Sequence, residues 1–286
     1  MAEFGLLDTD EVDAPGDEWE ELDVSDTEAD RVARVQDREF DEFRKRIKNT
    51  EQFKVEASVF DDATYGALYK LVQDGHIDAF GGPVSTGKEA NVYTALADDR
   101  EVAAKVYRIN ASDFTDMRGY LEGDPRLEEL GGNKKAVVTA WVKREFANLG
   151  RARAAGVRSP DPVAVERNIL VMEYLGTETG RAKRLGEVDV ENPETAFEVV
   201  REYLRRLYDA GLVHGDLSEY NIVVHDSELY VIDLGQAVTV HHPNHERFLE
   251  RDCENVAAFF ARQGVDTGGE ELLAYIDANA EPREDD

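Results

Sequence analysis

The clearest helical pattern in the chain lies in its second half, over residues 197–211 (FEVVREYLRRLYDAG). Apolar side chains recur there at i, i+3, i+7 and i+10, at Phe197, Val200, Leu204 and Leu207. This spacing predicts an amphipathic helix with one buried face, which ends at Gly211. After the last predicted strand, one or two closing helices complete the chain.

Two further segments show helical spacing, over 60–75 and over 140–156, and a glycine ends each of them. Asp61 or Asp62 is a suitable N-cap for the first helix. The side chains predicted to face inward are Tyr65, Leu68 and Val72 in the first helix, and Val142, Phe146 and Leu149 in the second.

Strand-like sequences surround the second of these helices. Residues 81–97 and 101–109 predict two strands, joined by a turn at Asp98-Asp99. Residues 161–166 and 168–176 predict a further strand pair. A short hairpin is expected before the apolar stretch LYVIDL, over residues 229–234.

The order of these elements predicts an α+β fold with two lobes, the layout of a reduced protein kinase. A strand-rich N-lobe over 49–172 is followed by a mostly helical C-lobe over 173–286. A P-loop NTPase would instead show repeated βα units around a parallel sheet. Residues 110–135 are Gly-rich and charged, and we expect a loop there that is too long for an idle connection.

The N-terminal segment of the chain is strongly acidic. The net charge of the chain is −29, and residues 1–30 hold 13 acidic residues and no Lys or Arg. Because such a segment cannot offset the entropy of ordering, we expect residues 1–48 to be an acidic, disordered tail that runs into a helix. The acidity elsewhere resembles that of halophilic proteins, in which molar salt screens surface repulsion. A surface that recruits a basic partner is the alternative, and no free nucleic acid binding is expected.

Cysteine content and hydropathy limit the classes of protein further. The single cysteine, Cys253, excludes an intrachain disulfide, and its helical surroundings predict a half-buried structural thiol. No apolar run approaches the length of a membrane span, and the acidic start does not fit a signal peptide. We therefore expect a cytoplasmic protein without a membrane partner.

The stretch GGPVSTGKEANVYTALA, over residues 81–97, has two interpretations. Gly82, followed after four residues by Gly87-Lys88, fits the Walker A spacing of P-loop NTPases, but Glu89 stands where that motif has Ser or Thr. A Walker A loop opens a helix, so a helix beginning at Lys88 would support this interpretation. The sequence Val92-Tyr93-Thr94 favours a strand instead.

A second set of motifs favours a kinase. HGDLSEYN fits H-x-D-x-x-x-x-N, in which Asn221 would bind a metal. Asp216 would accept the proton of the substrate hydroxyl or position the attacking nucleophile. Asp233 ends an apolar strand and matches the metal-binding Asp of D-F-G, with Leu in place of Phe. AAKVYRI matches the V-A-I-K strand, so Lys105 would hold the α- and β-phosphates and pair with Glu145. His214 is expected to brace the catalytic loop from beneath.

STGKEANVY, LVHGDLSEYNI and IDLGQAV resemble the Rio family of atypical serine/threonine protein kinases, in the subfamily that lacks a winged-helix domain. The resemblance runs from about residue 50 to about residue 265. It implies a reduced kinase fold, ATP with Mg²⁺ or Mn²⁺, Ser autophosphorylation, and a role in maturing the small ribosomal subunit. The acidity suggests a halophilic archaeal source.

The resemblance also assigns the opening stretch to the loop that covers the phosphates of ATP. Gly87 and Val92 remain from the glycine-rich kinase pattern, and Ser85 and Ala90 replace its outer glycines. Ser85, Thr86 and Lys88 could donate to phosphate oxygens, and Glu89 could orient the loop. In the connector, the carbonyl of Glu173 and the N–H of Leu175 should meet adenine, with Met172 behind it.

Two rival functions stay open. The first is an ATPase switch that acts on pre-ribosomes through an aspartyl-phosphate on Asp233. The second is a pseudokinase that binds ATP only as a scaffold. No A-P-E motif follows Asp233, and the remaining chain is too short for a full activation segment, so the protein substrate is unknown. A small ribosomal subunit precursor is the possible partner.

Overall fold

The computed structural model describes residues 60–109, 117, 119–120, 134–177 and 180–282. The predicted acidic tail and helix over 1–48 lie outside the described residues, as does most of the loop over 110–135. All elements below belong to the unit formed by Phe43–Asp286.

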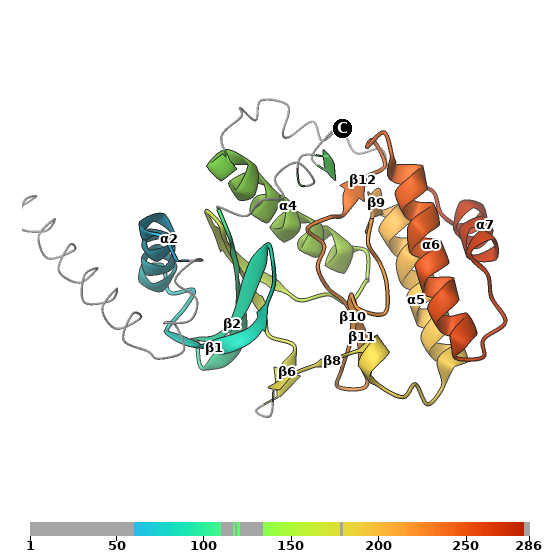
Figure 1. The fold of residues 1–286 in the computed structure, drawn as a ribbon, viewed down its shortest axis with the longest axis horizontal. Coiled ribbons are helices and arrows are strands. Elements are labelled where there is room, and N and C mark those ends of the chain that lie inside the picture. Colours follow the sequence, from blue (N-terminus) through green and yellow to red (C-terminus); the bar gives the residue numbers. More distant parts are fainter. Residues whose placement is uncertain (1–59, 110–116, 118, 121–133, 178–179, 283–286) are drawn as a thin grey trace, which may run out of the picture. The chain divides into compact units, whose positions relative to one another are not determined.

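A five-stranded antiparallel sheet forms most of the N-lobe (Figure 1). Its strand order is β1-β2-β3-β5-β4. The strands are β1 (Ala79–Thr86), β2 (Ala90–Ala97), β3 (Arg100–Tyr107), β4 (Pro162–Glu166) and β5 (Ile169–Glu173). The strand pair predicted over 161–166 and 168–176 is thus confirmed as β4 and β5.

The segment 81–97 forms two strands, and the prediction of a single strand there is wrong. The chain reverses between Thr86 and Ala90, so β1 and β2 form a hairpin. The turn predicted at Asp98 and Asp99 is confirmed between β2 and β3. Both aspartates have left-handed φ angles, of 50° and 59°, which suit a two-residue hairpin whose twist matches that of its strands.

Two helices pack against β4 and β5. In α2 (Asp62–Gln73), the N-cap is Asp61, whose carboxylate accepts a hydrogen bond from the Thr64 N–H at 2.8 Å. The second helix, α4 (Lys134–Ala154), begins before the predicted residue 140. Of the side chains predicted to face inward, Tyr65, Leu68, Val142 and Leu149 are buried, whereas Val72 and Phe146 are half-buried.

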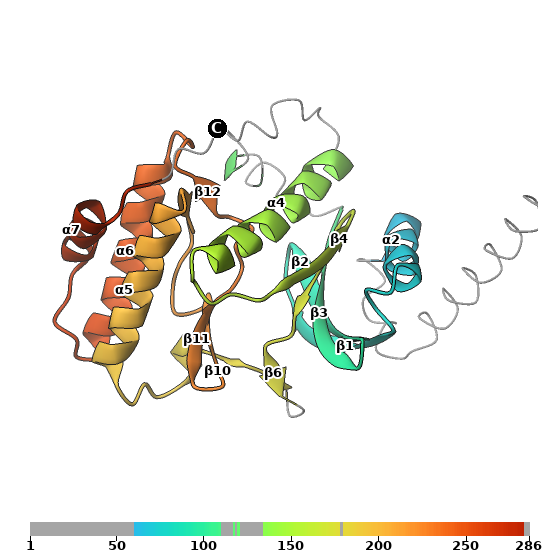
Figure 2. The ribbon, with the colours of Figure 1, turned by 180° about the vertical axis from the view of Figure 1, so that it is seen from behind.

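Three helices dominate the C-lobe (Figures 1 and 2): α5 (Pro193–Asp209), α6 (His245–Arg262) and α7 (Gly269–Asn279). The last two confirm the predicted closing helices. None of the helices in the described residues has both the length and the apolar character that crossing a membrane requires. The exact boundary between the lobes, placed between residues 172 and 173, stays a prediction.

Short strands carry the loops of the C-lobe. They are β6 (Gly176–Thr177), β7 (Gly180–Arg181), β8 (Lys183–Arg184), β9 (Leu212–Val213), β10 (Ile222–His225), β11 (Glu228–Val231) and β12 (Val238–Thr239), with one 3-10 turn, η3 (Leu185–Glu187). The predicted short hairpin is formed by β10 and β11, and β8 pairs with β10 on its other edge.

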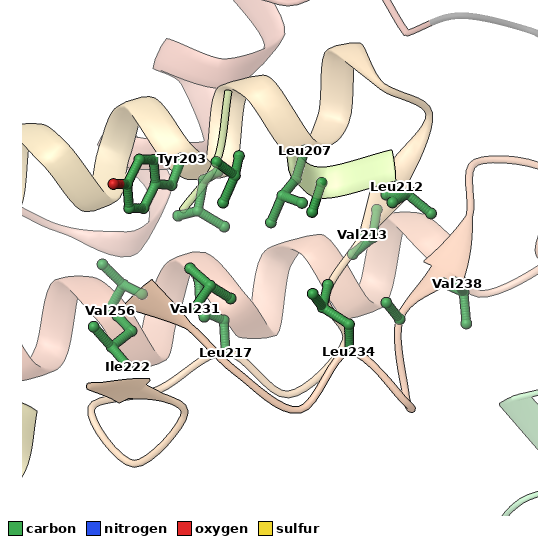
Figure 3. Packing of buried hydrophobic residues seen from close by; sticks show 14 of the residues in the cluster. Tyr203, Leu207, Leu212, Val213, Leu217, Ile222, Val231, Leu234, Val238 and Val256 are labelled. Atoms are coloured by element: carbon green, nitrogen blue, oxygen red, sulfur yellow. The ribbon is translucent and has the colours of Figure 1, made fainter. Parts of the chain in front are cut away.

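The core of the C-lobe confirms the stripe predicted on α5. Its four residues, Phe197, Val200, Leu204 and Leu207, are all buried. Figure 3 shows Leu217 and Leu234 packed into the same core. These two residues directly follow Asp216 and Asp233, so the core anchors both loops that carry the predicted chemistry.

Cys253 also lies in this core. It is 1% exposed, so the prediction of a half-buried thiol is wrong. The physical reason is that α6 packs against α5 and α7 at once, which covers the face that carries this residue. Burial raises the pKa of the Cys253 thiol to about 12.

Candidate active site

A cleft of about 500 Å³ brings together residues of both lobes. Most of the predicted site residues line it: Ser85, Thr86, Gly87, Lys88, Glu89, Lys105, Met172, Glu173, Leu175, Asn221 and Asp233. Asp216 and Glu145 are not among its lining residues. Each of these two nevertheless contacts a lining residue, as described below.

Lys105 is the central cation of the cleft. It lies on β3, and its Nζ atom is 2.7 Å from Glu145 Oε1 on α4 and 2.8 Å from Asp233 Oδ1 after β11. The predicted pairing of Lys105 with Glu145 is therefore present. Lys105 and Glu145 are buried, whereas the side chain of Asp233 is 51% exposed. One lysine thus connects the sheet, α4 and the C-lobe.

Burial and charge act against each other in this group. Burial alone would lower the pKa of Lys105, but Asp233 and Glu145 outweigh it and raise that pKa well above its usual value. Burial raises the pKa of the Glu145 carboxyl, although Lys105 limits the rise. The charge of Lys105 lowers the pKa of Asp233. At neutral pH Lys105 is therefore a cation and Asp233 an anion.

The loop that carries Asp233, residues 233–237, is called the metal loop below. Asp233 has a left-handed φ of 63°, which costs a residue other than glycine on the order of 1 kcal/mol. Such a conformation persists only where the surroundings fix it. Two buried residues of α4, Arg144 and Asn148, donate hydrogen bonds to carbonyl oxygens of this loop. The sequence analysis did not identify Arg144 and Asn148, because a polar residue on a helix is usually exposed to solvent.

The catalytic loop, residues 214–221, places Asp216 next to Asn221. The Asn221 side-chain nitrogen donates to the Asp216 backbone oxygen at 2.8 Å and lies 3.3 Å from its carboxylate. His214 is buried, and its Nε2 lies 3.0 Å from the carbonyl oxygen of Ile232. This position agrees with the predicted bracing role of His214.

Asp252, on α6, is a site residue that the sequence interpretation missed. Its carboxylate accepts hydrogen bonds from the N–H groups of Gly215 and Leu217, each at 2.7 Å, and so holds the catalytic loop on both sides of Asp216. Burial raises the pKa of Asp252 to about 6. The available signal was an acidic residue on the apolar face of a predicted helix, next to Cys253.

The phosphate-covering loop, Ser85–Glu89, is the turn of the β1–β2 hairpin. The Gly87 N–H donates to the Ala90 oxygen at 3.0 Å and to Asn91 Oδ1 at 3.3 Å. A Cβ atom at Gly87 would lie 2.9 Å from the Ala90 oxygen, so a side chain there would press on the backbone of β2 unless the turn shifts. The strand β2 follows, and no helix begins at Lys88. This finding excludes the Walker A interpretation.

The connector is held in an extended course. The Glu173 N–H donates to the Asp161 oxygen, and the Leu175 oxygen accepts from the Ala182 N–H, each at 2.8 Å. Glu173, Leu175 and Met172 line the cleft, as expected of residues near adenine. The individual contacts predicted with adenine stay predictions.

The donor groups of the cleft fit a metal that is shared with phosphate. No cluster of three or more His, Cys, Asp or Glu side chains suited to a metal occurs among the described residues. Asn221 and Asp233 nevertheless line the same cleft and offer oxygen ligands. Mg²⁺ typically binds one or two carboxylates and completes its shell with substrate phosphates and water.

Comparison with known proteins places the chain among kinases. Residues 91–272 match the family model described as RIO domain. The chain is 68% identical to the RIO-type serine/threonine-protein kinase Rio1 of Haloferax volcanii, over 96% of this chain and 95% of that protein. It is 37% identical to the Rio1 kinase of Methanocaldococcus jannaschii, over 84% and 83% of the two chains. The human serine/threonine-protein kinase RIO1 is 34% identical, and the match covers 44% of its length.

Solved structures confirm the kinase-like fold. The Rio2 kinase of Chaetomium thermophilum superposes with a TM-score of 0.61 at 22% identity, over 77% of this chain and 68% of that chain. A second structure, described as the Rio2 kinase-ADP/Mg²⁺-phosphoaspartate complex from the same organism, gives a TM-score of 0.56 over 76% and 66%. The predicted α+β fold with a strand-rich N-lobe and a helical C-lobe is thus correct.

Proposed function

This chain belongs to the RIO family of atypical serine/threonine protein kinases, and from this premise we propose that its cleft binds ATP with Mg²⁺ or Mn²⁺ and transfers the γ-phosphoryl group to a serine hydroxyl. The observation that supports this proposal best is the position of Lys105. It bridges Glu145 and Asp233 in the cleft that Asn221 also lines. A cation held in this way is preorganised to bind phosphate oxygens.

We assign the nucleotide to residues of both lobes. Lys105 would hold the α- and β-phosphates while Glu145 fixes its position. The loop Ser85–Glu89 would cover the triphosphate, and Met172, Glu173 and Leu175 would surround adenine. Asn221 uses its side-chain nitrogen to bind Asp216, which leaves Oδ1 as its metal ligand, beside a carboxylate oxygen of Asp233. The metal would neutralise charge on the phosphates.

Asp216 would act on the nucleophile rather than on ATP. Asp216 lies beside Asn221 but is not a lining residue of the cleft. This position suits a residue that contacts the hydroxyl of a substrate serine approaching from outside the cleft. Its carboxylate would accept the proton of the serine hydroxyl as the oxygen attacks the γ-phosphorus and ADP leaves.

A second candidate activity is an ATPase reaction through an aspartyl-phosphate. The half-exposed carboxylate of Asp233 favours it, because Lys105 keeps this group ionised and the cleft reaches it. The related Rio2 structure is described as containing phosphoaspartate. An oxygen of Asp233 would attack the γ-phosphorus with departure of ADP, and water would then hydrolyse the acyl-phosphate to restore the carboxylate.

The cellular task is a further proposal. As the sequence suggested, we propose a small ribosomal subunit precursor in the cytoplasm as the partner. Turnover of ATP measured with and without such precursors would test it. A rate unchanged by the precursors would contradict the switch on pre-ribosomes. The complete set of Lys105, Glu145, Asp216, Asn221 and Asp233 argues against the pseudokinase.

A labelled-ATP assay in molar KCl tests the two reactions. Asp216→Ala should retain nucleotide affinity and lose serine phosphorylation by about 10²–10⁴-fold, the usual contribution of a positioned proton acceptor. Asp233→Ala should abolish all transfer and weaken metal-dependent nucleotide binding. Asp226→Ala is the matched control, because Asp226 also has a left-handed φ but is exposed in the β10–β11 hairpin.

The chemistry of the bound phosphate separates the candidates. An aspartyl-phosphate is labile to hydroxylamine and should vanish in Asp233→Ala. Phosphate found only as hydroxylamine-resistant phosphoserine would reject the aspartyl route and leave a serine kinase. Wild-type protein without any metal-dependent transfer would refute the proposal as a whole.

A further inference from the structure

One face of α4 is polar where a packed helix is usually apolar. Trp141, Arg144, Glu145 and Asn148 follow each other at i, i+3, i+4 and i+7, the spacing of one helical face. All four are at most 4% exposed. Glu145 is explained by Lys105. The other three residues contact the metal loop.

Arg144 donates a hydrogen bond to the middle of the metal loop. Its Nη2 donates to the Gly235 oxygen at 2.6 Å, and its Nη1 donates to the Tyr120 oxygen. The guanidinium carbon lies over the Trp141 ring, 4.8 Å from the ring centroid. Arg144 therefore binds two separate backbone segments, the metal loop at Gly235 and the segment at Tyr120.

Asn148, one helical turn after Arg144, donates hydrogen bonds to the same loop. Its side-chain nitrogen donates to the Leu234 oxygen at 3.1 Å and to the Ala237 oxygen at 3.2 Å. An amide nitrogen carries two protons, so both are used. Three carbonyl groups of the loop, at residues 234, 235 and 237, are thus bound by two side chains of α4.

Packing completes these contacts. A Cβ atom at Gly235 would lie 2.9 Å from Trp141 Nε1 and 3.3 Å from the Tyr107 hydroxyl, so the loop lies directly on the helix and on β3. Asp233 comes immediately before the bound segment and keeps its left-handed backbone there. The bonds from α4 fix the residues that follow it.

We propose that Arg144 and Asn148 are positioning residues that hold the metal loop by its carbonyl oxygens, so that Asp233 presents its carboxylate to the metal and to Lys105. The proposal rests on the proposed function of Asp233 as a metal ligand. It has a mechanical consequence. Because Glu145 lies on the same helix, α4 and the metal loop move as one body, and both carboxylate partners of Lys105 keep a fixed separation.

Asn148→Leu tests the proposal, because leucine has a similar size but donates no hydrogen bond. The matched control is Asn168→Leu. Asn168 is buried to the same degree, and its side-chain nitrogen also makes two bonds, to Thr64 Oγ1 at 3.0 Å and to the Tyr107 backbone oxygen at 2.8 Å, neither of which belongs to the metal loop. Both variants leave buried polar groups unpaired, so both should lose stability.

The readout is Mn²⁺ binding to the protein–ADP complex in molar KCl, followed by electron paramagnetic resonance, with amide hydrogen exchange of residues 233–237. Asn148→Leu should weaken Mn²⁺ binding by about 10-fold or more, as loss of a residue that orients a metal ligand usually does. Exchange of the loop amides should rise. Asn168→Leu should keep wild-type Mn²⁺ affinity at a comparable loss of stability.

Equal Mn²⁺ affinity in the two variants would overturn the proposal. If Asn148→Leu does not fold, Arg144→Lys decides, because lysine keeps the charge but cannot reach both carbonyl groups. It should weaken Mn²⁺ binding in the same way, and unchanged binding would refute the role. Asp233→Ala identifies a different failure: if it binds Mn²⁺ as well as wild type does, the metal site itself is wrong.

Discussion

The phosphate-covering loop and the metal loop approach the same cleft from opposite lobes, yet they are held in different ways. In the first loop, Thr86, Gly87 and Lys88 are exposed, and the hydrogen bonds of the Gly87 N–H stay within its own hairpin. In the metal loop, Leu234 and Ala237 are buried, and side chains from a helix distant in the sequence bind its carbonyl groups.

This difference indicates a division of tasks. A loop held by its own hairpin and by one further backbone bond, from the Arg108 N–H to the Glu89 oxygen, can change shape at small cost when a nucleotide enters. A loop fixed by another element cannot move without that element. We therefore expect the N-lobe side of the cleft to adapt to ATP, and the C-lobe side to provide a rigid floor that sets the geometry of the metal and of Lys105.

The largest loss of stability should follow from Lys105→Ala, which removes the group between the two loops. Turnover should fall by about 10²-fold, the size typical of losing one preorganised electrostatic contact. Because Glu145 would remain buried without its cation, the free energy of unfolding should fall by about 3–5 kcal/mol. Denaturant unfolding and the labelled-ATP assay measure the two effects.

A double variant separates these two consequences. Adding Glu145→Gln to Lys105→Ala removes the uncompensated charge, so stability should partly return while turnover stays low. Recovery of turnover together with stability would show that Lys105 acts on the fold and not on the phosphates.

The next effect concerns Asp252, which holds the catalytic loop from α6 as Arg144 and Asn148 hold the metal loop from α4. Its pKa rises from the ordinary 3.8 to about 6, which corresponds to roughly 3 kcal/mol. The folded state therefore binds this proton more tightly than the unfolded state does. The contribution of Asp252 to the free energy of unfolding is fully present below about pH 4 and declines as the pH rises to about 6.

Asp252→Asn should remove this decline. Unfolding is measured for both proteins between pH 4 and pH 7 in constant high salt, and the difference between the two curves cancels the other titrating acids. Parallel curves would show that Asp252 keeps an ordinary pKa. Asp252 could then no longer be compared with Arg144 and Asn148 as a buried group that stabilises a loop of the site.

A smaller effect is expected from Gly235→Ala in the metal loop. The new methyl group would press on Trp141 and Tyr107, neither of which has room to retreat, since both are 2% exposed. Overpacking of this kind costs about 1–3 kcal/mol. Phosphoryl transfer should fall about 10-fold, because the loop must shift away from α4. Wild-type stability and rate in Gly235→Ala would mean that the metal loop is less rigid than its contacts indicate.

The smallest effect should come from Gly87→Ala in the covering loop. The contact with the Ala90 oxygen is as short as the one at Gly235, but this loop is exposed and can shift. The free energy of unfolding should fall by about 1 kcal/mol, the lower end of the usual cost of overpacking, because the exposed turn can move. The KM for ATP should rise a few-fold with little change in kcat. An effect as large as that of Gly235→Ala would remove the contrast between the two loops.

Features that depend on local sequence were predicted well. The stripe on α5, the cap at Asp61 and the turn at Asp98-Asp99 all follow from side-chain spacing or from residue type within a few positions. The pairing of Lys105 with Glu145 followed from the order of kinase motifs. The strand over 81–97 was wrong because its reversal at Gly87 carries no Asn-Gly or Asp-Gly signal.

The missed residues share one physical property. Arg144, Asn148 and Asp252 are polar, and each is buried because it binds backbone groups that lie at least 24 residues away in the sequence. A backbone N–H or carbonyl is present at almost every residue, so no side-chain pattern marks which of them needs a partner. Such contacts follow from the fold and not from local spacing.

The burial of Cys253 has a practical consequence for spectroscopy. It is the only thiol of the chain, it lies in the core of the C-lobe, and its raised pKa leaves it almost wholly protonated at neutral pH. Thiol-directed probes should therefore ignore it, and the natural chain serves as a silent background for labelling. A single cysteine introduced at exposed Lys88 would carry an environment-sensitive fluorophore at one defined place, and its emission would report nucleotide binding to the cleft.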